Sequence, residues 1–244
     1  MTLEIAVFNI SSALKAASAG ADRIELCENM PEGGTTPSYG CIQLARKKIS
    51  IPIFAMIRPR GGDFIYSEEE FQVMKTDINI CKLMGIDGIV FGILGVDGAI
   101  DVPRTLQLVD LAYPMDVTIH RAFDRTADPF RALEDIIHCG CQRILTSGQV
   151  PQADDGKELI KKIVQQAAGR ITIMPGSGVR SQNIRQIASF TEVSEIHSSA
   201  KKMVSPHLAS SHARMRESLM NVSVDELEIR QMKILLDEIQ ACQP

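Results

Sequence analysis

The sequence predicts an α/β fold, a (β/α)8 TIM barrel in a single domain that spans residues 1–244. First, short β-branched segments recur eight times, roughly 20–36 residues apart, which is the length of one strand–helix unit. Second, helical patterns separate these segments, and such repeats form parallel sheets through right-handed crossovers. Third, eight units close a barrel in a chain of about this length. An open doubly wound sheet is the alternative, but no glycine fingerprint follows the first strand.

The expected strands are short runs rich in β-branched and other apolar residues. In chain order they are "LEIAVFN", "RIELCE", "IPIFAMI", "GIVFGIL", "DVTIHRAF", "RILTSG", "RITIMPG" and "SEIHSSA". They begin near residues 3, 23, 51, 88, 116, 143, 170 and 194. Each run is followed by a segment with helical periodicity, as a barrel of strand–helix units requires.

Capping signals indicate where several of the helices begin. Ser67 is followed by Glu70, and Ser223 by Glu226, which is the spacing of a capping box. Asp128 stands before a proline, a typical N-cap followed by a residue that favours the first helical position. We therefore expect helices to begin directly after Ser67, Asp128 and Ser223.

A long segment, residues 202–222, has no clear helix or strand pattern before the last helix. Loops of this length are uncommon in compact domains unless they are functional. The basic residues in and beside the segment are Lys201, Lys202, Arg214 and Arg216. The segment is expected to be a lid over an anionic ligand, an oligomer contact or a solvated loop.

Composition limits the classes of function. The net charge of −4 gives no indication of a nucleic acid or a membrane surface as the main partner. No apolar run approaches the roughly 18–20 residues that span a bilayer. The chain enters a strand pattern at its first residues, without the features of a targeting segment, so we expect a cytoplasmic protein. In that setting its six cysteines should be mostly reduced.

Polar side chains in the barrel lumen are the first candidates for function. Side chains alternate along a strand, and apolar residues fill the helix-facing positions of the expected strands. Buried charges are costly unless they are paired, and barrel enzymes keep their chemistry at the carboxyl ends of the strands. A structural network that fills a narrow barrel is the alternative. The candidate catalytic residues in the lumen are Glu4, Glu25, Arg58, His120 and His197.

The loops at the barrel mouth supply further candidates. "TIHRAFDR", residues 118–125, concentrates charge where the fifth strand ends, and it makes Asp124 a sixth catalytic candidate. Glycine-rich turns after the late strands of a barrel often hold a phosphate. Tight turns in which glycine only supplies backbone freedom are the alternative. The candidate anion-binding residues are Arg60, Ser147, Gly148, Gly176, Gly178 and Ser198.

The combination of "RIELCE", "EGGTTPS", "MIRPRGGDF", "HRAFD", "ILTSG" and "IHSSA" closely resembles the CutC family of copper homeostasis proteins. The resemblance runs in order from Glu4 to about Ala200, and "IRPRGGDF" together with "HRAFD" is highly specific. It implies a TIM barrel, a cytoplasmic location, frequent dimers or larger oligomers and an association with copper tolerance. It does not imply a particular reaction.

The chain departs from the family pattern at one position. Many members resemble "EVCV" or "EICV" in the first strand, with an inward cysteine proposed as a copper ligand, but Ala6 stands there in this chain. The second proposed cysteine matches Cys27. Copper(I) prefers two or three soft donors, so a site at Cys27 needs Met56 or Met174 as well. The other soft cluster, "HCGC" at 138–141, continues an apolar pattern and is interpreted as structural.

Two functions follow from the sequence. The resemblance implies a CutC-like protein of copper homeostasis, with copper as its ion and Cys27 as a metal ligand. The alternative is an enzyme in which Glu25 or Glu4 acts with His120 as acid and base on a small anionic or phosphorylated metabolite. The expected partners are a small molecule or a metal ion and further copies of the chain, with no nucleic acid and no membrane. A third hypothesis, beside these two functions, is a degenerate barrel that serves as a scaffold.

Overall fold

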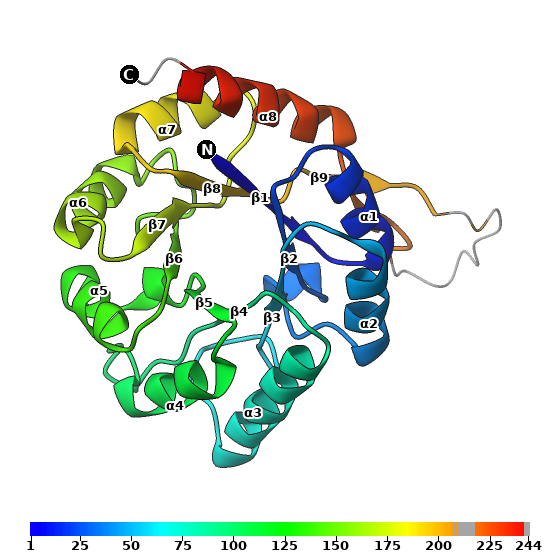
Figure 1. Ribbon diagram of the computed structural model, residues 1–244. Coiled ribbons are helices and arrows are strands. Elements are labelled where there is room, and N and C mark those ends of the chain that lie inside the picture. Colours follow the sequence, from blue (N-terminus) through cyan, green and yellow to red (C-terminus); the bar gives the residue numbers. More distant parts are fainter. Residues whose placement is uncertain (207, 209–217, 242–244) are drawn as a thin grey trace.

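The computed structural model describes residues 1–206, 208 and 218–241. Eight parallel strands form one sheet in the order β7-β6-β5-β4-β3-β2-β1-β8. β7 and β8, the two ends of this order, lie beside each other, so the sheet is a nearly closed barrel. The helices form an outer ring around the strands (Figure 1). The expected single TIM-barrel domain is therefore confirmed.

The barrel alternates strands and helices along the chain. The strands are β1 Thr2–Val7, β2 Arg23–Leu26, β3 Ile53–Met56, β4 Gly88–Phe91, β5 Asp116–Ile119, β6 Arg143–Thr146, β7 Thr172–Pro175 and β8 Glu195–Ser198. The helices are α1 Ile10–Ser18, α2 Tyr39–Lys48, α3 Glu68–Leu83, α4 Val102–Ala112, α5 Pro129–His138, α6 Lys157–Ala167, α7 Ile184–Thr191 and α8 Glu226–Ala241. Within the described residues, none of these helices has the length and hydropathy that a membrane crossing needs.

Two of the expected helix starts are confirmed. At α3, Ser67 Oγ accepts a hydrogen bond from the Glu70 N–H (3.2 Å), and the Glu70 carboxylate accepts one from the Ser67 N–H (2.8 Å). This reciprocal pair satisfies two backbone donors that the first helical turn leaves free. Asp128 caps α5 by accepting from the first backbone N–H groups of that helix.

The third expected helix start is wrong. Ser223 does not cap α8 but lies in a strand, where its Oγ is 3.4 Å from Lys15 Nζ. The residue that precedes α8 is Asp225, whose carboxylate accepts a hydrogen bond from the Leu227 N–H (3.1 Å). Because this strand extends to residue 224, the helix begins two residues later than the Ser223 signal predicted.

The segment expected to lack regular structure contains strands at both of its ends. β9 (Lys201–Val204) and β10 (Asn221–Val224) pair as an antiparallel hairpin beside α1, so the expectation of an irregular 202–222 segment is wrong there. Lys201 and Lys202 belong to β9. Residues 207 and 209–217, including Arg214 and Arg216, lie outside the described residues, and the lid and oligomer roles expected of them remain predictions.

The register of β1 brings polar lumen residues from three strands together. β1 pairs with both β2 and β8, and Glu4 is in register with Arg23 on one side and His197 on the other. Because paired positions in a parallel sheet share a face, these three side chains all point into the barrel. The alternate residues, Leu3 and Ile5, are fully buried against the helices. This register determines the geometry of the candidate site.

Candidate functional site

A cavity of about 480 Å³ opens among the loops at the carboxyl ends of the strands. Its volume is within the range of small-molecule sites, which is about 300–1,000 Å³. Five of the residues predicted from the sequence line it, and they come from different strands and loops. They are Glu25, Arg58, His120, Gly178 and His197.

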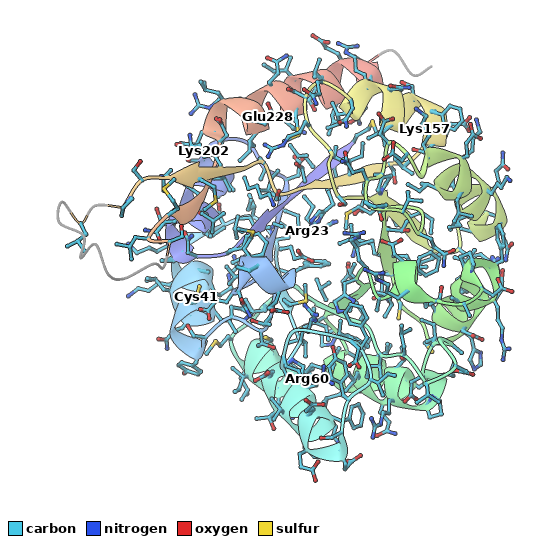
Figure 2. All side chains as sticks on the ribbon, turned by 180° about the vertical axis from the view of Figure 1, so that it is seen from behind. Arg23, Cys41, Arg60, Lys157, Lys202 and Glu228 are labelled. Carbon is cyan, nitrogen blue, oxygen red and sulfur yellow. The ribbon has the colours of Figure 1, made fainter. Side chains whose placement is uncertain are left out.

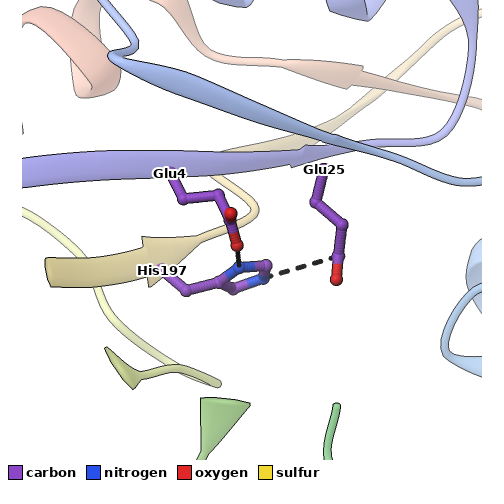
Figure 3. A group of neighbouring side chains, drawn as sticks. All are labelled: Glu4, Glu25 and His197. Carbon is purple, nitrogen blue, oxygen red and sulfur yellow. Dashed lines mark hydrogen bonds and ion pairs between the residues drawn. The ribbon is translucent and has the colours of Figure 1, made fainter. Parts of the chain in front are cut away.

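Glu4 lies beneath the cavity and holds His197 in place. Its carboxylate is fully buried, and Oε1 is 2.8 Å from His197 Nδ1 (Figure 3). The other carboxylate oxygen accepts a hydrogen bond from Arg23 Nε. Burial alone would raise the pKa of Glu4, but the hydrogen bond from His197 and the charge of Arg23 outweigh burial and lower it to about 2. Glu4 is therefore ionised near neutral pH, and its carboxylate orients the imidazole of His197.

Glu25 lines the cavity next to this pair. Its Oε2 lies 3.9 Å from His197 Nε2 and 3.5 Å from Cys27 Sγ, while its Oε1 is buried and has no hydrogen-bond partner among the described residues. Burial raises the pKa of Glu25. Burial would lower the pKa of His197, but the carboxylates of Glu25 and Glu4 outweigh it and raise that pKa. Glu25 and His197 together can therefore take up, hold or exchange a proton at the cavity floor.

An ion-pair layer below the site was not predicted. Arg23 is buried and bridges Glu4 and Glu195, with 2.5 Å between Arg23 Nη2 and Glu195 Oε2. Arg143 Nε lies 2.8 Å from the same Glu195 oxygen, and the Phe54 ring lies 4.8 and 5.0 Å from the guanidinium carbons of Arg23 and Arg143. Arg23 appears near the centre of the barrel in Figure 2. The signal was available, because Arg23 has the same strand parity as Glu25.

His120 lines the cavity from the end of β5. Its Nδ1 accepts a hydrogen bond from the Ala122 N–H (3.2 Å). Burial and the neighbouring positive charge of Arg58 lower the pKa of His120 to about 3. The ring is therefore neutral near pH 7 and does not carry a second proton there. A pKa this low does not favour the acid–base role predicted for His120.

The two arginines expected at the mouth have different positions. Arg58 is buried, and its guanidinium donates to the carbonyl oxygens of Glu32 (2.5 Å), Gly34 (2.9 Å) and Gly62 (2.8 Å), so it joins two loops of the cavity wall. Arg60 Nε instead bonds Glu70 at 2.5 Å, and Arg60 does not line the cavity. In Figure 2 Arg60 lies over the α3 side of the barrel. The geometry therefore does not support the part in anion binding that was predicted for Arg60.

Asp124 holds the turn after β6 and does not line the 480 Å³ cavity. Its carboxylate accepts hydrogen bonds from Thr146 Oγ1 (2.5 Å), from the backbone N–H groups of Ser147 and Gln149, and from Arg121 Nε (2.8 Å). So many donors from neighbouring residues indicate that Asp124 anchors this turn, and its predicted catalytic role gains no support from this geometry. Ser147 was expected to bind an anion, but its backbone N–H donates a hydrogen bond to this carboxylate.

Three further anion-site candidates have their donors engaged within the protein. The Gly148 N–H bonds Thr146 Oγ1 (2.9 Å), the Gly176 N–H bonds the Thr146 carbonyl oxygen (2.9 Å), and Ser198 Oγ donates to the Val179 carbonyl oxygen (2.7 Å). Of the late-turn residues in that prediction, Gly178 alone lines the cavity, with φ of 72°. The geometry therefore does not build an anion site from these turns.

Of the sulfur donors considered for copper, Cys27 and Met56 lie close together and Met174 does not. A Cβ placed on Gly34 would be 3.3 Å from Cys27 Sγ and 3.5 Å from Met56 Cε, so these two sulfur-bearing side chains are neighbours in one cluster. Cys27 is buried, and burial together with the charge of Glu25 raises the pKa of its thiol well above the usual value. Met174 lies elsewhere, because its sulfur is 3.3 Å from Arg23 Nη2 in the ion-pair layer.

The "HCGC" segment lies at the end of α5, away from the cavity. Cys139 and Cys141 are buried in the main hydrophobic core, and burial raises the pKa of the Cys139 thiol to about 11 and that of the Cys141 thiol well above its usual value.

 Neither thiol is therefore available as a soft anionic donor at neutral pH. This agrees with the structural interpretation of residues 138–141.

Comparison with known proteins places the chain in a family. The model of the CutC family matches residues 1–202. A family protein named CutC from Chromobacterium violaceum is 50% identical over 202 residues, which cover 83% of this chain and 82% of the relative. The human copper homeostasis protein cutC homolog is 48% identical over 199 residues, 82% of this chain and 73% of the relative.

A solved structure agrees with the sequence relatives. The crystal structure of a CutC protein from Streptococcus agalactiae superposes with a TM-score of 0.78 at 32% identity, covering 82% of this chain and 98% of that one. Glu4, Glu25, His120 and His197 all lie within the residues 1–202 that the family model covers. The chain belongs to the CutC family.

Proposed function

We propose that the chain acts in copper homeostasis by binding a copper ion at the floor of the cavity, with Cys27, Glu25 and His197 as ligands. One observation carries the proposal: Glu25 Oε2 lies near two further donors of suitable chemistry, 3.5 Å from Cys27 Sγ and 3.9 Å from His197 Nε2. The names of the human and mouse relatives, copper homeostasis protein cutC homologs, support the choice of metal.

The donor set fits copper better than a hard cation. Thiolate and thioether sulfur favour copper(I), and imidazole suits copper in either oxidation state. Met56 is a neighbour of Cys27, and its thioether can be the second soft sulfur donor that the alanine at position 6 cannot provide. Glu4 accepts the hydrogen bond from His197 Nδ1, as outer-shell carboxylates do for ligating histidines, and so leaves Nε2 free.

Proton release is a consequence of this donor set. The raised pKa of Cys27 keeps it a thiol in the metal-free protein, and a thiol must lose its proton to bind a metal as thiolate. A bound cation would offset the negative charge of Glu25 that now opposes ionisation. Copper binding should therefore be tighter at higher pH.

The test is a copper(I) titration under reducing conditions against a chromophoric chelator. Cys27→Ser, Glu25→Gln and His197→Gln should each weaken binding by more than the roughly 10–100-fold that loss of an outer-shell partner costs. Cys41→Ser is the matched control, since Cys41 lies on α2 away from the cavity, and it should bind as the wild type does. Wild-type affinity in both Glu25→Gln and His197→Gln would reject the site.

A second candidate function is an acid–base enzyme that acts on a small molecule. The observation that favours it is the size of the cavity, about 480 Å³, together with the buried and unpartnered Glu25 Oε1 in its wall. Glu25 would transfer the proton with His197, and Glu4 would hold His197 in position. This replaces the pairing with His120 that the sequence suggested.

The two functions respond differently to one pair of variants. If the chain is an enzyme, metal-free protein turns over its substrate, Glu25→Gln loses about 10²–10⁴-fold in kcat, and Cys27→Ser keeps its rate. If copper binding is the function, Cys27→Ser is the damaging change. Turnover of an identified substrate that survives in Glu25→Gln would exclude the acid–base role.

We also propose that the chain works in the cytoplasm as a homo-oligomer. Cys27, Cys41, Cys81, Cys139 and Cys141 are free thiols, which supports a reducing compartment. Apolar side chains that are exposed on and next to the β9–β10 hairpin support self-association. Light scattering on the purified protein tests the second part, and a monomeric mass at micromolar concentration would contradict it.

A further inference from the structure

His120 lies across the barrel from the acid–base pair. It follows β5, which is four strands from β1 in the sheet order, whereas Glu25 and His197 lie on β2 and β8, the two neighbours of β1. Both groups line the same cavity. A molecule in the cavity would therefore have Glu25 and His197 on one side and His120 on the other.

The hydrogen-bond partners of the ring fix where its proton lies. Nδ1 accepts from the Ala122 N–H, so in the neutral ring the proton is on Nε2. Nε2 is buried and has no hydrogen-bond partner in the part of the chain that the structure describes. A buried donor without an acceptor is unfavourable, so a ligand oxygen at Nε2 would satisfy it.

The surroundings hold the ring in this orientation. The Phe64 ring lies 4.9 Å from the His120 ring, tilted by 54°. On another side Gly92 packs so closely that a Cβ there would be 2.7 Å from Nδ1. The charge of Arg58, together with burial, keeps the ring neutral near pH 7. His120 is thus a fixed donor and not a proton carrier.

Basic side chains line the cavity on both of these sides. Arg121 and Arg125 follow β5 on the side of His120, and Lys201 lies at the start of β9, which follows β8 on the side of His197. The charge of Arg121 is shared with Asp124, with which it forms an ion pair. Side chains of this kind attract anionic groups into a cleft. A ligand with both an acceptor oxygen and a negative charge matches this wall better than a neutral or cationic one.

We propose that the cavity binds a small organic oxyanion, a carboxylate or a phosphate ester, and that His120 donates a hydrogen bond from Nε2 to one of its oxygens. The inference deepens the second candidate function and rests on a small molecule entering the cavity. It does not depend on copper. In a reaction, His120 would stabilise negative charge that develops on that oxygen while Glu25 handles the proton.

The test compares two amide variants that differ in where they place the donor. Gln at position 120 places an amide N–H near the original Nε2, whereas Asn places its polar atoms near Nδ1. With metal-free protein and pyruvate or sulfate as probes, we expect His120→Gln to bind within about 3-fold of the wild type. His120→Asn and His120→Leu should bind about 10-fold or more weakly, since hydrogen bonds to charged groups are the stronger ones.

Each probe represents one of the two ligand classes, because pyruvate carries a carboxylate and sulfate is a tetrahedral stand-in for a phosphate. Equal affinity in His120→Asn and the wild type for both probes, or binding of neither probe by folded wild type, would overturn the proposal. The assay measures binding and not turnover. An oxyanion site in a protein that is not an enzyme would still bind a probe, whereas a failed oxyanion site would not.

A direct readout of the ring itself comes from nitrogen NMR on histidine-labelled protein. His120 should appear as the neutral form with its proton on Nε2 at pH 5.5, and the Nε2 signal should move when the probe is added. A ring that is protonated at pH 5.5, or an Nε2 signal unchanged at saturating probe, would contradict the assignment.

Discussion

Replacing Arg23 by Met is expected to lower the free energy of unfolding by about 3–5 kcal/mol, as breaking a buried ion pair on one side does. Arg23 is buried between Glu4 and Glu195, so the substitution leaves a fully buried carboxylate without its cation. Urea denaturation at pH 7 measures the change.

The matched control is an arginine in an exposed ion pair. Arg170 and Glu134 form a pair whose side chains are nearly half exposed, and pairs of that kind contribute about 0–1 kcal/mol. Arg170→Met should therefore cost no more than about 1 kcal/mol. If Arg23→Met cost as little as this control, the ion-pair layer would not be a structural support of the site.

The same ion-pair layer makes the free energy of unfolding depend on pH in the acidic range. The pKa of Glu4 is lowered from its ordinary 4.5 to about 2, so the stabilisation that comes from the ionised form is complete above pH 4.5 and is lost as the pH falls toward 2. Without Arg23 the pKa of Glu4 rises, and this part of the acid dependence should become smaller. Unfolding curves of wild type and Arg23→Met at pH 6 and pH 3 compare the two.

Replacing Gly156 by Ala is expected to cost about 3 kcal/mol, the upper part of the range for overpacking. A Cβ at this position would lie 2.0 Å from the Ser147 carbonyl oxygen and 2.9 Å from Gly148 Cα. Both are backbone atoms of the turn that Asp124 holds, so no flexible side chain can move aside. Thermal and urea unfolding measure the loss.

Gly40→Ala is the matched control for the glycine substitution. Gly40 lies in the first turn of α2, and a Cβ there would have nothing within 4 Å. Because Ala is the better helix former, this variant should gain roughly 0.5–1 kcal/mol. A Gly156→Ala protein as stable as the wild type would show that the turn after β6 adapts, and that Asp124 does not fix it.

The barrel was predictable because its signals are local and repeated. The spacing of eight β-branched runs, the capping box at Ser67 and the cap at Asp128 each depend on a few neighbouring residues. Strand parity also placed Glu25, His120 and His197 in the lumen, and all three line the cavity. These features needed no knowledge of distant contacts.

The parts that could not be predicted depend on distant partners. β9 and β10 are short, and their pairing joins segments on either side of residues 205–220, so no local pattern identified them or the role of Ser223. Similarly, the sequence showed Asp124 as a charge at the mouth but not that the turn after β6 fills its hydrogen-bonding capacity. Whether a polar group is free to bind a ligand is a property of the folded chain.

The choice of acid–base partner shows the same limit. The sequence placed both His120 and His197 in the lumen and paired His120 with Glu25 or Glu4 as acid and base. In the structure, Glu4 and Glu25 raise the pKa of His197 against its burial, whereas burial and Arg58 lower that of His120 to about 3. Two histidines with the same predicted position therefore have opposite chemistry, because their neighbours come from different strands.

The central claim is that the floor of the cavity binds copper, and diffraction at the copper absorption edge tests it most directly. Crystals of the protein loaded with one equivalent of copper(I) under reducing conditions should show one anomalous peak, among Cys27, Glu25 and His197. A peak at Cys41 or at Cys139 and Cys141, with none at the cavity floor, would contradict the account.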